Sequence, residues 1–200
     1  SLLTDALIVL QADAPEGQVF SKWNDGKADN PRIVTAADAS QLFPLFLPKT
    51  GQGAVCVKLP VLAGAGMGAV NVNAAAVTEG ESVQLKLVVL PSYSQSSVKV
   101  FANGKELDAT LSLRASSETK TLFYTLSGLS EDVDVEVSGL KQNEYVVSLE
   151  QQDGGIVRAS QVGMVKHGTI VTLEAAPDRG NMFVKWEDGN TLNPYRYVVT

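Results

Sequence analysis

The sequence predicts an all-β protein made of tandem small antiparallel modules in an elongated array, and three observations support this fold class. Apolar and polar residues alternate with a period of two along several segments, such as residues 83–87, 133–137 and 171–175. Asp-Gly and Asn-Gly pairs stand between these segments, where tight hairpins require positive φ angles. The chain also repeats itself, which is typical of modular architectures.

Two copies of one unit are visible without any gap in the alignment. Residues 7–33 and 170–196 agree at 10 of 27 positions, whereas unrelated sequences would share about one or two. The shared glycine, Phe-x-x-Trp, Asp-Gly and Asn-Pro positions are Gly17, Phe20, Trp23, Asp25, Gly26, Asn30 and Pro31, matched by Gly180, Phe183, Trp186, Asp188, Gly189, Asn193 and Pro194. We therefore expect the same strand-and-hairpin structure in both segments.

A third and more diverged copy is predicted between these two. Residues 80–85 correspond to 168–173, and the glycine-led segment 68–72 corresponds to 155–159. Phe101, Asn103 and Gly104 take the places of the tryptophan, the aspartate and the glycine. This copy lacks the Asn-Pro pair and carries a polar insert around residues 114–120. A ligand that needs the tryptophan and aspartate side chains would therefore not find them here.

The repeats divide the chain into residues 1–48, 49–140 and 141–200. On the template of the middle copy, the first copy lacks its two opening strands and the last lacks its closing strand. A unit as short as residues 1–48 would bury little core by itself. Two explanations remain open: the sequence is cut from a longer array, which we favour, or the physical domains are phased differently from the repeats. In an array, neighbouring repeats cover each other's exposed surface.

Charge and hydropathy argue against two classes of partner. The net charge of −6 disfavours nucleic acid, because phosphates require a clustered basic face. No apolar run approaches the roughly 18 residues that suggest a membrane span. The 44% of hydrophobic residues is enough for packed cores, so we expect folded modules rather than disorder.

No catalytic device is visible in the sequence. His167 is the only histidine, which excludes histidine-rich metal coordination, and we interpret it as a solvated loop residue. Cys56 lies in an apolar run and is interpreted as a small buried hydrophobe. The glycine-rich residues 64–68 are followed by a strand-like segment, whereas a phosphate loop must open a helix, so a hairpin turn is expected there. We therefore predict neither an enzyme nor a cofactor.

The acidic turns allow two interpretations. Asp25, Asp29 and Asn30, and likewise Asp188 and Asn193, could supply oxygen ligands to calcium. The structural interpretation is that these side chains bond to nearby backbone N–H groups, as they do in many turns. We favour the structural interpretation and predict no metal site.

The repeated pattern of glycine, Phe-x-x-Trp, x-Asp-Gly and Asn-Pro before a strand resembles the divergent internalin-type B-repeats of bacterial surface proteins. The resemblance implies extracellular tandem β-modules, compact and similar to a β-grasp or small sandwich, that act as spacers or adhesive segments. It implies no catalytic residue and no cofactor.

The aromatic positions leave the function open. In an unbulged strand Phe20 and Lys22 share one face and Trp23 lies on the other, unless a β-bulge turns it inward. The tryptophan then either closes its own core, packs on a neighbouring repeat of the chain, or offers a stacking platform. The residues proposed to contact a glycan or a host or cell-surface protein are Trp23, Asp25, Asn30, Trp186, Asp188 and Asn193. An accessory domain of a glycan-processing enzyme is a more remote alternative.

Overall fold

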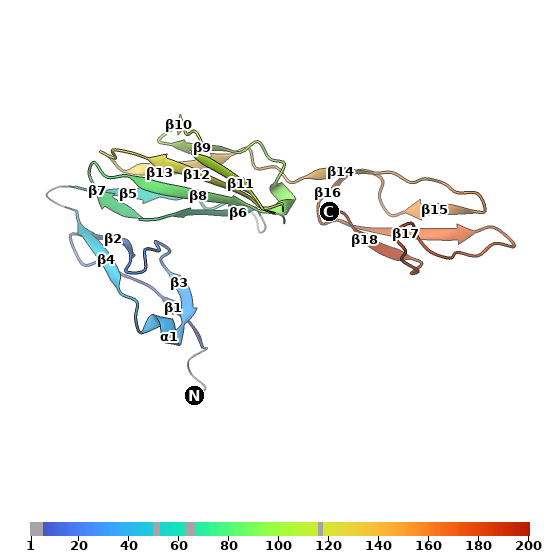
Figure 1. Cartoon of the computed structure of the whole chain (residues 1–200), viewed down its shortest axis with the longest axis horizontal. Helices are drawn as coiled ribbons and strands as arrows, with labels where there is room; N and C mark the ends of the chain where they lie inside the picture. The colour runs from blue at the N-terminus through green and yellow to red at the C-terminus, as the bar shows by residue number, and fades with distance from the viewer. Residues whose placement is uncertain (1–5, 50–52, 63–66, 116–117) are drawn as a thin grey trace. The chain divides into compact units, whose positions relative to one another are not determined.

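The computed structural model describes residues 6–49, 53–62, 67–115 and 118–200, and its regular structure is almost entirely strand (Figure 1). The elements are β1 (Leu7–Leu10), β2 (Gln18–Trp23), β3 (Arg32–Thr35), α1 (Ala36–Ala39), β4 (Pro44–Pro48), β5 (Ala54–Lys58), β6 (Gly68–Val72), β7 (Ala76–Thr78), β8 (Val83–Val89), η1 (Pro91–Tyr93), β9 (Lys99–Ala102), β10 (Lys105–Glu106), β11 (Leu111–Arg114), β12 (Lys120–Leu126), β13 (Val133–Ser138), β14 (Glu144–Val147), β15 (Gly155–Ala159), β16 (Gly163–Lys166), β17 (Ile170–Pro177) and β18 (Tyr195–Val198). The predicted all-β fold class is confirmed.

The chain divides into two compact units. The first comprises residues 1–91 and 97–140, and the second comprises residues 92–96 and 141–200. Residues 92–96 thus belong to the second unit, although the residues on both sides of them belong to the first. The comparison of the repeats did not predict this division.

The larger part of the first unit consists of a five-stranded sheet, ordered β10-β9-β13-β5-β7, and a four-stranded sheet, ordered β11-β12-β8-β6. Its core follows the predicted alternation, since Val83, Leu85, Leu87 and Val89 of β8 are at most 1% exposed. One pairing departs from the antiparallel expectation, because β13 runs parallel to β5. A parallel pair requires a long connection, which the residues between these two strands provide.

The pair of strands β6 and β8 in the middle copy has the register of its counterpart in the second unit. Strand β6 pairs with β8 from Gly68↔Val89 to Val72↔Leu85. Strand β15 pairs with β17 from Gly155↔Pro177 to Ala159↔Leu173. The sequence correspondences 68–72 with 155–159 and 80–85 with 168–173 are therefore matched by equivalent strand pairs.

The Asn-Gly pair of the middle copy forms a different turn from its expected counterparts. Asn103 and Gly104 both have positive φ angles, 47° and 77°. They join β9 to β10 as a two-residue hairpin with Lys105 opposite Ala102. Phe101 lies half-buried in β9. These residues therefore align in sequence with the tryptophan turns described below, but they form a turn of different geometry.

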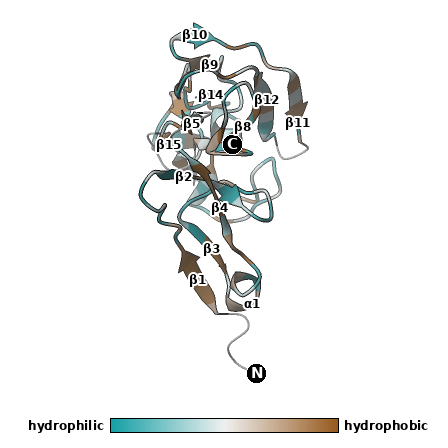
Figure 2. Ribbon diagram, turned by 90° about the vertical axis from the view of Figure 1, so that its left-hand side faces the viewer, coloured by the Kyte–Doolittle hydropathy of each residue, from teal (hydrophilic) through white to brown (hydrophobic). Residues whose placement is uncertain are grey.

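The first copy contributes two small antiparallel sheets, β1-β3 and β2-β4. Strand β1 is strongly apolar, as Figure 2 shows by its colour, and Leu7 and Val9 remain 72% and 65% exposed. The short helix α1 begins after Thr35, whose hydroxyl accepts a hydrogen bond from the N–H of Asp38. Strand β2 contacts the middle copy through Ser21, whose hydroxyl donates to the carbonyl of Ala76 at 2.6 Å.

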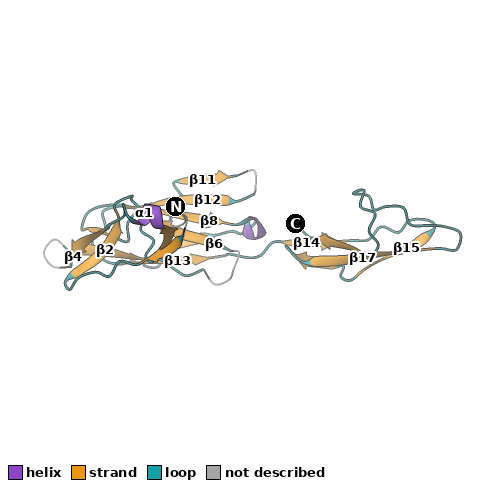
Figure 3. Cartoon of the chain, turned by 90° about the horizontal axis from the view of Figure 1, so that it is seen from below, coloured by secondary structure: helices purple, strands orange, loops and turns teal. Residues whose placement is uncertain are grey.

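The second unit has a small core. It contains the sheets β14-β16 and β15-β17-β18. Val165, Val171 and Val199 are its buried cluster, and partly buried apolar residues pack around them. Figure 3 draws the chain between β17 and β18 as loop, and this loop carries the second copy of the Phe-x-x-Trp pattern.

Candidate functional site

The first Asp-Gly pair closes a turn that begins and ends on backbone hydrogen bonds. The N–H of Trp23 donates to the carbonyl of Lys27 at 2.8 Å, and the N–H of Gly26 donates to the carbonyl of Trp23 at 2.9 Å. Asp25 Oδ1 accepts from the N–H of Lys27 at 3.2 Å. Gly26 has a φ of 82°, which L side chains rarely adopt. We call residues 23–27 the first tryptophan turn.

The second Asp-Gly pair repeats this turn bond for bond, and we call residues 186–190 the second tryptophan turn. The N–H of Trp186 donates to the carbonyl of Asn190 at 2.8 Å, and that of Gly189 to the carbonyl of Trp186 at 3.0 Å. Asp188 Oδ1 accepts from the N–H of Asn190 at 2.9 Å. Gly189 has a φ of 86°. In both turns the acidic side chain bonds to backbone, as the structural interpretation predicts.

Both indole rings are held by the loop that follows them. Trp23 Nε1 donates to the carbonyl of Asp29 at 2.8 Å, and Trp186 Nε1 donates to the carbonyl of Leu192 at 2.7 Å. Each acceptor lies six residues beyond its tryptophan. The indole N–H is therefore used inside the module and is not offered to a ligand.

The asparagine of each Asn-Pro pair bonds to both backbone groups of one alanine, and we call this contact the asparagine bridge. Asn30 accepts from the N–H of Ala12 at 2.9 Å and donates to its carbonyl at 2.8 Å. Asn193 accepts from the N–H of Ala175 at 2.9 Å and donates to its carbonyl at 2.7 Å. Both Asn-Pro peptide bonds are cis. The side-chain amide thus makes the two backbone hydrogen bonds that a residue of a neighbouring strand would make in a sheet.

The strand pairs beside the turns have the same register. Leu7 lies opposite Thr35 in the first copy, and Ile170 lies opposite Val198 in the second. Each residue of the second pair lies 163 positions after its counterpart in the first pair. Gly17 and Gly180 also match, with φ angles of 75° and 92°. In each case the residue after the glycine donates its N–H to a carbonyl three residues earlier, at 3.0 Å.

The guanidinium of Arg32 covers the indole ring of Trp23. Arg32 forms two hydrogen bonds of 2.9 Å to the carboxylate of Asp25, and its guanidinium lies 5.8 Å from the centre of the Trp23 ring. Its side chain is 8% exposed. The hydrogen bond from Arg32 lowers the pKa of Asp25, and the same bond raises the pKa of Arg32. Trp23 is 3% exposed.

In the second copy a tyrosine stands where the first has Arg32. The ring of Tyr195 lies 6.4 Å from that of Trp186, and a hydrogen bond with Asp188 raises the pKa of the Tyr195 hydroxyl. The residue after Asn-Pro therefore contacts both the turn aspartate and the indole in each copy. Trp186 itself stays half-buried.

Of the two arrangements considered for the aromatic pair, the one with a β-bulge forms in the first copy. The pairing of β2 with β4 shifts register between Phe20 and Lys22, and such a bulge moves the following side chains to the other face. Phe20 and Trp23 consequently contact each other edge to face, with ring centres 5.7 Å apart. In the second copy the rings of Phe183 and Trp186 lie 5.1 Å apart.

An open groove of 1120 Å³ lies beside the second tryptophan turn. Its aromatic and aliphatic lining includes Ile156, Leu173, Phe183, Trp186, Tyr195 and Tyr197. Asp188 also lines it. Of the residues proposed to contact a ligand, the groove therefore brings Trp186 and Asp188 together.

Two single residues differ from their predicted settings. Cys56 is half-buried rather than buried, because Val55 and Val57 take the core-facing positions of β5. Burial and the charge of Asp132 raise the pKa of its thiol. His167 does lie in a turn, but it is half-buried, and its Nδ1 is 3.4 Å from the hydroxyl of Tyr145.

The remaining candidates are placed as follows. Residues 64–66 of the glycine-rich segment lie outside the described residues, and β6 follows that segment as a strand. Among the described residues, no group of three or more His, Cys, Asp or Glu side chains could hold a metal ion. No helix in the described part of the chain has the length and apolar character needed to cross a membrane.

Sequence reasoning missed Arg32, Tyr195 and Ser21. The alternation of β3 contains a signal for Arg32, since it shares the buried face with Val34. A buried arginine needs a partner, and the sequence does not show which acid provides it. Nothing in the sequence indicated that Ser21 sits at a bulge and bonds to a distant strand.

These strand pairs and turns define a class of small all-β modules in which an aromatic hairpin is fixed by an asparagine. Residues 145–197, which contain the second tryptophan turn and its asparagine bridge, match the family described as Divergent InlB B-repeat domain. The resemblance drawn from the residue pattern is thereby confirmed for this segment. No curated protein and no solved structure matches the chain.

Proposed function

We propose that this chain is a non-catalytic, extracellular segment of a bacterial cell-surface or secreted protein, in which β-modules of one kind follow one another and serve as a spacer or adhesive array. Domains of the matched family are typical of bacterial surface proteins and are generally non-catalytic. Neighbouring modules of the same chain are the first partners that such an array requires.

The observation that carries this proposal is the pair of tryptophan turns with their asparagine bridges. Two segments 163 residues apart make the same backbone, indole and amide hydrogen bonds. The shared residues are thus used to hold a hairpin together, whereas a shared active site would preserve groups that face a substrate. Repeated modules of a structural scaffold are expected to share such internal hydrogen bonds.

The location is tested on intact bacteria that produce the protein. Antibodies against residues 145–197 should label unpermeabilised cells or the culture medium, and external protease should remove the signal from the cells. A cytoplasmic marker protein serves as the control for lysis. Labelling only after permeabilisation would overturn the proposal.

The spacer role is tested separately by small-angle X-ray scattering of residues 1–200. An array that holds other domains apart should scatter as a stiff rod, with a maximum dimension well above that of a globular chain of this length. Scattering of a compact sphere would rule out a spacer and leave the adhesive role.

A second candidate is binding of a glycan or a protein, because Trp186 lies half-buried in the wall of an open groove. Aromatic rings with one open face are suited to stacking on sugars and to protein contacts. A glycan array and a pull-down with Trp186→Ala beside the unchanged chain test this candidate. Val162→Ala, an exposed position outside the groove, is the matched control. Equal binding by all three chains would exclude the role.

A further inference from the structure

Strand β11 is an addition to the repeat in the middle copy, and it forms the outer strand of the four-stranded sheet. The sheet order is β11-β12-β8-β6, and Figure 3 shows the four strands in this order. In the other two copies no strand lies between the tryptophan turn and the next strand, which is β3 or β18. Strands β10 and β12 stand before and after β11 in the chain. The outer edge of β11 therefore does not depend on where the sequence begins or ends.

The backbone groups of β11 point alternately toward β12 and toward the open edge. The two strands pair antiparallel, and just beyond β11 the N–H of Ala115 continues the register by donating to the carbonyl of Thr119 at 3.0 Å. Because hydrogen-bonded pairs alternate along such a ladder, the N–H and carbonyl of Leu113 also face β12, whereas those of Ser112 and Arg114 point away from it. Within the described part of the chain, no other segment forms a backbone hydrogen bond with Ser112 or Arg114.

The same alternation places the leucines of β11 on the outer face of the sheet. Leu111 and Leu113 are 50% and 49% exposed. Leu111 lies opposite Phe123 of β12, which is half-buried, whereas the adjacent Leu122 is buried on the core face. Strand β11 thus combines outward backbone groups with half-exposed leucines, and an edge of this kind is a template for pairing with another strand.

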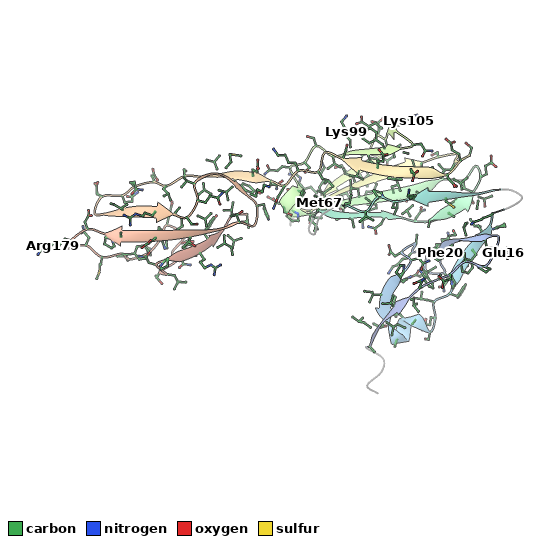
Figure 4. The ribbon with its side chains drawn as sticks, turned by 180° about the vertical axis from the view of Figure 1, so that it is seen from behind. Glu16, Phe20, Met67, Lys99, Lys105 and Arg179 are labelled. Atoms are coloured by element: carbon green, nitrogen blue, oxygen red, sulfur yellow. The ribbon has the colours of Figure 1, made fainter. Side chains whose placement is uncertain are left out.

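The two edges of the five-stranded sheet are protected from such pairing. One edge is β10, whose residues Lys105 and Glu106 are both charged and exposed (Figure 4 labels Lys105). At the other edge, β7 is contacted by β2, since the N–H of Ala75 donates to the carbonyl of Ser21 at 2.7 Å. Charged side chains and covering strands are common means of preventing contact between sheet edges. Strand β11 carries one charge, that of Arg114.

We propose that β11 pairs antiparallel with β11 of a second copy of this chain, about a two-fold axis at Leu113, so that two four-stranded sheets join into one. Ser112 of each copy then lies opposite Arg114 of the other, and each such pair exchanges two backbone hydrogen bonds. Leu113 lies opposite Leu113 of the second copy, and Leu111 lies opposite Ala115. Such a two-fold contact is closed and gives a dimer rather than a filament. The inference does not depend on where the protein is located or on whether it acts as a spacer.

The two neighbouring registers are less favourable than the one centred on Leu113. A register centred on Ser112 would need an outward N–H at Thr110, but that N–H donates to the carbonyl of Phe123 at 2.8 Å. A register centred on Arg114 would place two arginines directly opposite each other, where like charges are destabilising. About Leu113 the strand complements itself in backbone hydrogen bonds, apolar contact and charge, so the occupant of the edge is a second copy of the chain.

Sedimentation equilibrium of residues 1–200 at increasing concentration tests the dimer. Because the contact is small, we expect a reversible monomer–dimer equilibrium that shifts toward dimer as the concentration rises. Leu113→Lys places like charges at the axis and removes the leucine contact, so dimerisation should weaken about tenfold or more. Val162→Lys makes the same kind of change at a position that is 58% exposed in the second unit, and should leave the equilibrium unchanged. A chain that stays monomeric, or equal dimerisation by both variants, would overturn the proposal.

A backbone variant separates strand pairing from contact between side chains. Ser112→Pro removes an N–H that points away from β12, so the pairing of β11 with β12 is retained. The dimer loses one hydrogen bond at each of its two symmetric positions and should weaken about tenfold or more. Ser112→Ala keeps the N–H and should dimerise as the unchanged chain does. Circular dichroism checks the fold, and equal dimerisation by the two folded variants would overturn strand pairing.

A cysteine at the axis tests the register, and it also gives an answer if Ser112→Pro fails to fold. In a Cys56→Ala background, Leu113→Cys should form a disulfide-linked dimer under a mild oxidant. The Cα atoms of directly opposite residues in a pair without hydrogen bonds are about 4.5 Å apart, which suits a disulfide. Thr125→Cys, an exposed position of β12 away from the edge, should stay monomeric. Linkage through residue 125 but not through residue 113 would assign the contact to the face of the sheet and overturn the edge dimer.

Discussion

Asn193 holds both backbone groups of Ala175, donating to the carbonyl at 2.7 Å and accepting from the N–H at 2.9 Å. The two residues are 18 positions apart, and Asn30 and Ala12 are related in the same way. An amide side chain is suited to this role because it carries a donor and an acceptor side by side. The bridge ties the loop before the last strand of the hairpin to the first strand.

The asparagine bridge should be measurable in the exchange of a single amide. Asn193→Ala leaves the N–H of Ala175 to solvent and should lower the free energy of unfolding of the second unit by about 1 kcal/mol. Native-state hydrogen exchange at Ala175 should accelerate accordingly. Asn193→Asp keeps the acceptor and should retain more protection than alanine does. Thr191→Ala, an exposed neighbour, should change nothing; equal exchange in all variants would contradict the role of the bridge.

The ion pair of Asp25 with Arg32 should make stability depend on pH. The pKa of Asp25 is lowered in the folded state, so its contribution is present above the unfolded pKa and is lost as the pH falls through the folded pKa. Asp25→Asn should cost about 1 kcal/mol at pH 7, a small value because the carboxylate is partly exposed. Urea unfolding at pH 7 and in the acid range should show a smaller pH dependence in Asp25→Asn. An unchanged dependence would mean that the pair contributes nothing.

The two tryptophans should differ in quenching by acrylamide. Trp186→Phe leaves only Trp23, which is 3% exposed, and its emission should be blue-shifted and protected. Trp23→Phe leaves only the half-buried Trp186, which should be quenched more strongly. Both variants are compared with the urea-unfolded chain as the fully exposed reference. Equal quenching constants in the folded variants would contradict the difference in burial.

The contact of Ser21 with the middle copy should contribute to the stability of the first unit. Ser21→Ala removes the hydroxyl that donates to the carbonyl of Ala76 at 2.6 Å in a buried setting, and should cost about 1–2 kcal/mol. The backbone bond from the N–H of Ala75 to the carbonyl of Ser21 remains in this variant. Thermal unfolding measures the loss, and Ser130→Ala at an exposed site is the control. No difference between the two variants would show that the hydroxyl bond is not stabilising.

Cys56 should react slowly with thiol reagents in the folded chain. Burial raises the pKa of its thiol, so less thiolate is present at a given pH than in the unfolded chain. The rate of reaction with a chromogenic disulfide should therefore rise at a higher pH in the folded protein than in urea. Identical pH profiles in the two states would contradict the raised pKa.

Much of the candidate site follows from local sequence. The Asp-Gly pairs predict hairpins because glycine accepts the positive φ at Gly26 and Gly189, and the aspartates bond to backbone two residues away. These are contacts between near neighbours, so the spacing of residue types is enough to predict them. The divided second unit, the parallel pair of β5 and β13, and the different turn at Asn103 were not foreseeable in this way.

The sequence by itself determined that strands alternate, that hairpins close at Asp-Gly, and that residues 7–33 and 170–196 share the same turn, because each of these depends on period, spacing and residue type. The tertiary structure alone decided that a bulge in β2 turns Trp23 inward and that Arg32 covers its ring. The physical reason is that burial depends on which distant segment covers a side chain. The two tryptophan turns make the same hydrogen bonds, yet Trp23 is 3% exposed beneath Arg32 whereas Trp186 is half-buried.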